Sequence, residues 1–143
     1  MINEASIDSP VPSHRLYSVG QITFATFAAS PLAGCLLLTI NYLALQKSRA
    51  AWQSLIWGLI STIILLGIAA VLPENFPRFV LPLACSVAMR SLVSYLQGDA
   101  IKSHLGSGGK QGSWWITVGL SVGVVLLLFA MVVGGIVLYA NLG

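Results

Sequence analysis

The stretch that decides how this chain folds is residues 77–105, PRFVLPLACSVAMRSLVSYLQGDAIKSHL. It is the only long apolar segment of the sequence with a charged residue, Arg90, well inside it. Four polar residues recur in it at intervals of four, four and three: Ser86, Arg90, Ser94 and Gln97. On a helix these intervals form one polar stripe with apolar residues on the other sides. The stripe must face protein, water or lipid headgroups.

The composition indicates an all-α, polytopic membrane protein. Of 143 residues, 57% are hydrophobic and only 8% are charged, against about 25% charged in a soluble domain. Several apolar runs exceed the roughly 18 residues that mark a membrane span. The seven Lys and Arg residues lie scattered rather than clustered. They therefore indicate membrane topology and no nucleic-acid partner.

The apolar runs predict a four-helix membrane bundle. A polar N-terminal tail covers residues 1–17, and the membrane domain covers residues 18–143. The expected spans are about 19–45, 52–72, 77–97 and 114–140. Pro31 lies near the middle of the first run and should kink it. Asn41 shares a helical face of that run with small residues, which predicts packing against another helix.

The first run also contains Leu32-Ala33-Gly34-Cys35, a match to the bacterial lipoprotein processing pattern. Cleavage there would make Cys35 the lipidated first residue. Against this interpretation, the sequence stays apolar for ten residues after Cys35, and the region upstream is long and carries two acids. We expect Cys35 to remain an ordinary buried residue of an uncleaved helix.

Charge placement predicts the orientation of the four spans. The connections after the first and third spans carry Lys47, Arg49, Lys102 and Lys110, and only Arg15 and Arg78 lie on the other side. The positive-inside rule then places both termini outside the cytoplasm, in the periplasm of a bacterial cell. At mid-helix an arginine costs about 2.5 to 3.5 kcal/mol to insert, so the third span is marginal alone. Arg90 either snorkels to the interface or faces a partner or an anion path.

The chain shows no pattern of catalytic, cofactor or metal residues. Intramembrane proteolysis would need paired aspartates, a serine with a base, or H-E-x-x-H within a span, and the sequence has none of these. Both histidines, His14 and His104, lie outside the predicted spans, so no haem site is expected. We therefore expect a protein without enzymatic activity, cofactor or metal.

Several short motifs occur together between residues 17 and 118. They are SPLAG, the pair Asn41-Tyr42, the proline turn at 73–77, LQGDAI with His104, and GGKQGSWW. As a set they resemble a pattern in a family of small bacterial inner-membrane proteins with four spans. The resemblance implies that location and layout and brings no activity with it.

Two functions fit these features. The first is a small bundle that binds another membrane protein or a membrane-inserted toxin, as immunity proteins of similar size do. The second is a small oligomeric channel or transporter subunit, in which Ser86, Arg90, Ser94 and Gln97 line a path that favours anions. In both, the lipid bilayer is the surrounding solvent, and the contact residues expected are Asn41 and the four members of the stripe.

The lipoprotein pattern generates a direct test. Because the sequence after Cys35 continues as an apolar helix, we expect the intact mass of the membrane-extracted protein to include residues 1–34. A mass that begins at Cys35 with an added diacylglyceryl group would contradict this expectation.

Overall fold

The structure of the chain is a computed structural model that describes residues 14–77 and 79–142. These ranges contain five helices: α1 (Val19–Ala28), α2 (Pro31–Ala44), α3 (Ser48–Val71), α4 (Val80–Gly106) and α5 (Trp114–Leu142). Three of them, α3, α4 and α5, are long and apolar enough to cross a membrane. The chain is thus a small, all-α, polytopic membrane protein. Most of the expected polar tail, residues 1–13, lies outside the described residues.

The first apolar run differs from the expected single kinked helix over 19–45. It forms two helices of 10 and 14 residues, separated at Ala29 and Ser30. The physical reason is Pro31, because its ring disfavours the helical conformation for the residue before it. Ser30 is accordingly extended, with φ −179° and ψ 168°. The structure therefore does not confirm four spans, since neither short helix has the length of the three long ones.

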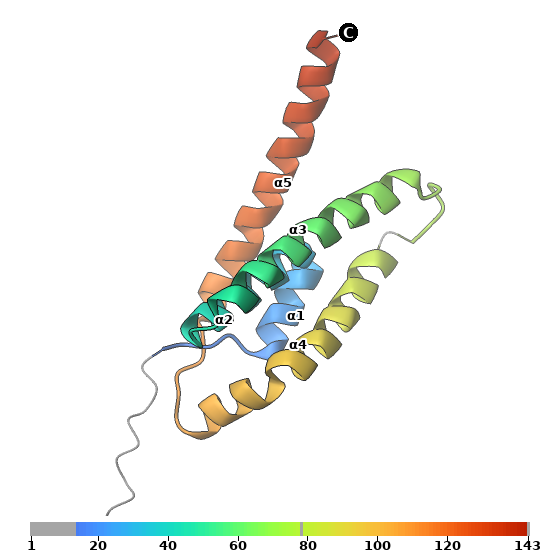
Figure 1. The fold of residues 1–143 in the computed structure, drawn as a ribbon. Helices are drawn as coiled ribbons and strands as arrows, with labels where there is room; N and C mark the ends of the chain where they lie inside the picture. The colour runs from blue at the N-terminus through green and yellow to red at the C-terminus, as the bar shows by residue number, and fades with distance from the viewer. Residues whose placement is uncertain (1–13, 78, 143) are drawn as a thin grey trace, which may run out of the picture.

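The two short helices pack against each other as a hairpin. A β-carbon placed at Gly34 of α2 would overlap the Thr26 hydroxyl of α1 and come within 3.2 Å of the Ile22 carbonyl oxygen. Only glycine permits this approach of the two backbones. Around the hairpin, α4 packs mainly on α1 and α3 mainly on α2, while α5 contacts both short helices. Figure 1 shows α1 between α3 and α4, with α5 diverging from the other helices.

A tight turn connects the hairpin to α3. Gln46 adopts a left-handed conformation with φ 59°. The Gln46 and Lys47 N–H groups then donate to the carbonyl oxygens of Leu43 and Tyr42, at 3.0 and 2.8 Å. This is a Schellman-type ending, which satisfies the last carbonyls of α2 and reverses the chain. The reversal lays α3 along α2.

Small side chains form the interface between α2 and α3. Thr39 and Ser54 share a hydrogen bond of 2.7 Å between their hydroxyl oxygens. Gly58 of α3 is buried against Cys35 of α2, and a β-carbon at Gly58 would overlap the Cys35 β-carbon. Such small-residue contacts are typical of helix pairs in membranes.

Beyond the tip of the hairpin, α3, α4 and the turn that joins them line a half-open apolar pocket of about 420 Å³. Its lining includes Leu65, Leu72, Phe76 and Leu81, with Glu74 at its edge. The C-terminal part of α5 also lies free of the bundle, because every residue from Phe129 to Leu142 is exposed. These surfaces suit contact with lipid tails or with another membrane protein.

The glycines of α3 provide a matched pair of substitutions. Gly58→Ala should destabilise the protein by about 1 to 3 kcal/mol, because the new methyl group overpacks the contact with Cys35. Gly67→Ala, in the same helix, meets no atom within 4 Å and should be neutral or slightly stabilising. Thermal unfolding in detergent measures both changes. Equal effects of the two substitutions would contradict the packing of α3 on α2.

Candidate functional site

The buried face of α4 decides which members of the predicted stripe point inward. Its buried side chains recur at helical spacing: Ser86, Met89, Val93, Gln97, Ile101 and His104. This face packs chiefly on α1. At about 100° per residue, the centre of the buried face is formed by Ser86, Val93, Gln97 and His104, with Met89 and Ile101 toward its margins. The polar stripe therefore runs from this centre toward one margin.

The structure divides the stripe into two pairs. Ser86 and Gln97 are buried, at 5% and 1% exposure, whereas Arg90 and Ser94 are exposed. Ser94 lies about 80° from the centre of the buried face, beyond its margin. Arg90 lies between the angular positions of buried Gln97 and Ile101, so the rotation of the helix alone does not account for its exposure. The fifth candidate, Asn41, is fully buried and joins the inward pair through a hydrogen bond from its amide nitrogen to Gln97 Oε1, at 3.2 Å.

The side-chain amide of Asn41 forms hydrogen bonds with both backbone polar groups of Tyr17. The Tyr17 N–H donates to Asn41 Oδ1 at 2.7 Å, and Asn41 Nδ2 donates to the Tyr17 carbonyl oxygen at 2.9 Å. Because a backbone N–H can only donate and a carbonyl can only accept, this pair fixes the orientation of the Asn41 amide. Nδ2 then donates also to Gln97 Oε1, which fixes the Gln97 amide in turn. The Gln97 amide nitrogen is left buried without a partner among the described residues.

Gln21 forms a second buried link at the same end of the bundle. Its side-chain nitrogen donates to the Gly112 carbonyl oxygen at 2.7 Å. Its side-chain oxygen accepts from the Ser18 N–H at 2.9 Å, and its own N–H donates to the Ser18 hydroxyl at 3.3 Å. The last two bonds form a capping box, which begins α1. The Ser18-x-x-Gln21 spacing was the sequence signal that could have located this residue.

Residues 14–18, here called the N-terminal strap, lie across this end of the bundle. The Leu16 N–H donates to the Lys110 carbonyl at 3.2 Å, and the Gly112 N–H donates to the Leu16 carbonyl at 2.8 Å. Leu16 and Tyr17 are 0% and 6% exposed. Part of the expected polar tail is therefore integral to the fold. Burial raises the pKa of the Tyr17 phenol, which nearby Arg15 opposes, so the ring stays neutral.

The two histidines meet at the strap. Their ring centroids lie 4.9 Å apart in a stacked arrangement. His104 is 6% exposed, and its Nε2 atom has no hydrogen-bond partner in the described part of the chain. Neither sequence position suggested this contact, because 90 residues separate them. Within residues 14–77 and 79–142, no group of three or more His, Cys, Asp or Glu side chains could hold a metal ion.

The site is thus a polar junction, defined by Tyr17, Gln21, Asn41, Gln97 and Gly112. It joins the strap, α1, α2, α4 and the loop before α5 through hydrogen bonds. All its side chains are neutral amides or a phenol, so its chemistry is hydrogen bonding. It can hold helices in register or bind a hydrogen-bond acceptor at Gln97, and it offers no nucleophile or general base.

Comparison with known proteins identifies no family for this chain. No protein-family model, curated protein or solved structure matches the chain. The long apolar helices indicate a small polytopic membrane protein. The resemblance to a four-span family is not supported by any match.

The polar junction predicts a specific effect of Asn41→Leu. The substitution leaves both backbone groups of Tyr17 buried without partners, so we expect a loss of about 2 to 4 kcal/mol and release of the strap. Trypsin should then cleave after Arg15, where the Leu16 N–H is otherwise hydrogen bonded. The cleavage is followed by mass spectrometry.

Leu43→Ala is the matched control for this experiment. Leu43 lies in the same helix and is 55% exposed. It should leave both the thermal midpoint and the cleavage after Arg15 unchanged. Unaltered cleavage in Asn41→Leu would show that the strap does not depend on the Asn41 bonds.

Proposed function

We propose that this protein is a non-enzymatic integral membrane protein of the bacterial inner membrane that binds another membrane protein within the bilayer. A membrane-inserted toxin, neutralised in the manner of an immunity protein, is the partner type that suits its small size. The single observation that supports the proposal is the exposure of Arg90 on α4.

The position of Arg90 makes it costly to leave facing lipid. Ten helical residues, Val80 to Met89, precede it in α4, which places it about 15 Å from that end of the helix. The nearest acid in the sequence, Asp99, follows nine residues later, or about 13 Å along the axis. The two side chains therefore cannot form a direct pair on a straight helix. A partner that supplies a carboxylate or carbonyl oxygens would cover the charge.

The surroundings of Arg90 fit a contact between helices. Ser91, next to Arg90, and Ser94, one turn along, are also exposed. Helix α4 thus presents an arginine and two hydroxyls among exposed apolar residues such as Val87 and Leu92. By contrast, buried Gln97 bonds Asn41 in the polar junction, and buried Ser86 bonds the Leu83 carbonyl of its own helix. Arg90, with its exposed neighbours Ser91 and Ser94, is available to a partner.

A second candidate function, a small oligomeric channel or transporter subunit, rests on the same pair. In an oligomer, the exposed face with Arg90 and Ser94 would line a path between copies of the chain. The identity of the molecule that covers this face separates the two functions. A different protein favours partner binding, and a second copy of the chain favours the channel.

The test is photo-crosslinking in the native membrane with a photoreactive amino acid in place of Ser94. We expect an adduct with another membrane protein that Arg90→Ala reduces several-fold and Arg90→Lys largely retains, because the charge is what the partner recognises. Leu92→Ala, at a residue that is 47% exposed on the same helix, serves as the control and should retain the adduct. Adducts with lipid alone, or an adduct unaffected by Arg90→Ala, would contradict the proposal.

A further inference from the structure

The two helices of the hairpin are each too short to cross a membrane. The 10 residues of α1 rise about 15 Å and the 14 residues of α2 about 21 Å. The hydrocarbon core of a bilayer is about 30 Å thick. Helices α3, α4 and α5, with 24, 27 and 29 residues, exceed that thickness. Neither helix of the hairpin can therefore cross the bilayer as a single helix, whereas each of the three long helices can.

Both ends of the hairpin lie at one end of the bundle. Tyr17, just before α1, is hydrogen bonded to Asn41 in the last turn of α2. The tip lies far from this point, because the Leu32 N–H donates to the Thr62 hydroxyl of α3 at 3.0 Å. Thr62 is 14 residues, or about 21 Å, along α3 from Ser48. The hairpin thus enters and leaves at the same end.

At the tip of the hairpin the backbone is buried and the N–H groups that begin α2 are hydrogen bonded, while the buried Ser30 hydroxyl has no partner among the described residues. Inside a membrane, irregular backbone is tolerated only where it is buried and its polar groups are satisfied. Ser30 and Pro31 are buried. Pro31 has no N–H, the Leu32 N–H bonds Thr62, and the N–H groups of Ala33 and Gly34 donate to the Ser30 carbonyl at 3.1 and 3.4 Å. The first turn of α2 therefore has no free backbone donor to hydrate.

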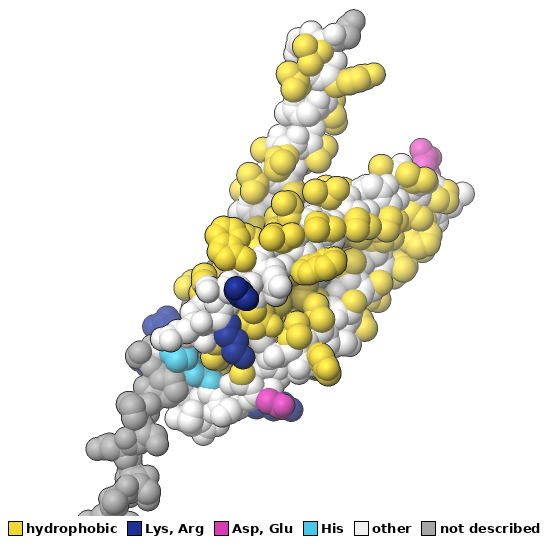
Figure 2. Space-filling view, viewed as in Figure 1, with side chains coloured by type: hydrophobic (Ala, Val, Ile, Leu, Met, Phe, Trp, Pro, Cys, Tyr) yellow, Lys and Arg dark blue, Asp and Glu magenta, His cyan; other side chains and the backbone are white. Residues whose placement is uncertain are grey.

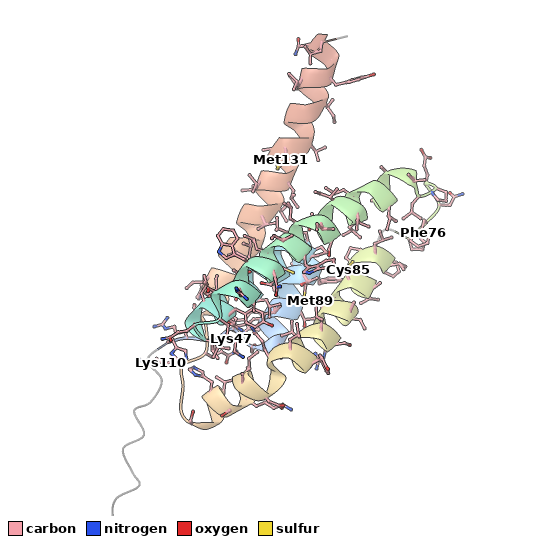
Figure 3. The ribbon with its side chains drawn as sticks, in the orientation of Figure 1. Lys47, Phe76, Cys85, Met89, Lys110 and Met131 are labelled. Carbon is pink, nitrogen blue, oxygen red and sulfur yellow. The ribbon has the colours of Figure 1, made fainter. Side chains whose placement is uncertain are left out.

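The hairpin also brings the positive charges together. With both ends of the hairpin on one side, Arg15 joins the residues of the two connections at that end: Lys47, Arg49, Lys102 and Lys110. Figure 3 shows Lys47 and Lys110 at the end of the bundle opposite Phe76, and Figure 2 shows Lys and Arg side chains gathered near the histidines. The connection between α3 and α4 contributes Glu74 and, by sequence, Arg78. The charge bias is five to one, which is stronger than the four to two of a four-span layout.

We propose that the chain crosses the membrane three times and that α1 and α2 form a re-entrant hairpin inserted from the cytoplasmic side. The N-terminus and the strap are then cytoplasmic, and the C-terminus lies on the opposite side. The expectation that both termini share one side does not fit this arrangement, because an odd number of crossings separates them. This topology is independent of the proposed partner.

Cysteine labelling of the full-length protein in intact cells tests the topology. Three single substitutions place a thiol before α1, at the start of α3 and in the α3–α4 connection: Ser9→Cys, Ser48→Cys and Asn75→Cys. A membrane-impermeant maleimide should label Asn75→Cys in intact cells, and the other two only after permeabilisation. The unsubstituted protein, whose Cys35 and Cys85 lie within α2 and α4, is the background control.

Each alternative topology gives a different labelling pattern. Labelling of Ser9→Cys in intact cells together with Asn75→Cys would overturn the hairpin, because the first run would then cross the membrane. Labelling of Ser48→Cys in intact cells would overturn the orientation. A fluorescent protein that matures only in the cytoplasm, fused before Met1, should fluoresce in cells, and a dark but full-length fusion would contradict the proposal without any cysteine substitution.

Discussion

The two hydrogen bonds between the Asn41 amide and the backbone of Tyr17 are the interaction on which the other features depend. They hold the start of α1 beside the end of α2, and so close the base of the hairpin. The same amide donates to Gln97 and thereby ties α4 to this base. Without these bonds the buried backbone groups of Tyr17 would lack partners, a cost that favours release of the strap. The strap, the hairpin and α4 therefore form one unit.

Several buried polar side chains of this protein form contacts between segments. Thr62 satisfies the first turn of α2, Ser54 bonds Thr39, and Gln21 reaches the loop before α5. In a bilayer, apolar burial does not drive helices together, because lipid tails are as apolar as leucine. Small residues and hydrogen bonds take over that role. A polar residue that the fold does not use, such as Arg90, is for this reason the best indication of a partner.

The candidate site was predictable only in part. Helical spacing placed Ser86 and Gln97 on one stripe with Arg90 and Ser94, and it placed Asn41 on a face expected to pack against another helix; in the structure Ser86, Gln97 and Asn41 are buried. The same spacing could not separate the two buried members of the stripe from Arg90 and Ser94, because all four lie within one arc of the helix. Which side of that arc is covered depends on where α1 packs. The hydrogen bonds between Tyr17 and Asn41 could not be predicted from the sequence. The strap precedes the first helix, and a non-helical segment has no residue periodicity that would indicate its contacts.

The sequence by itself determined the membrane class, the long helices α3 and α5 and the break point at Pro31, because length, hydropathy and proline stereochemistry are local properties. Only the tertiary structure decided that the chain reverses at Ser30 instead of bending there. A proline break allows either outcome, and the choice depends on contacts between segments: Gly34 against Thr26 and the Tyr17 bonds to Asn41. That reversal brings both ends of the hairpin to one end of the bundle, and Arg90 lies on the exposed surface of α4.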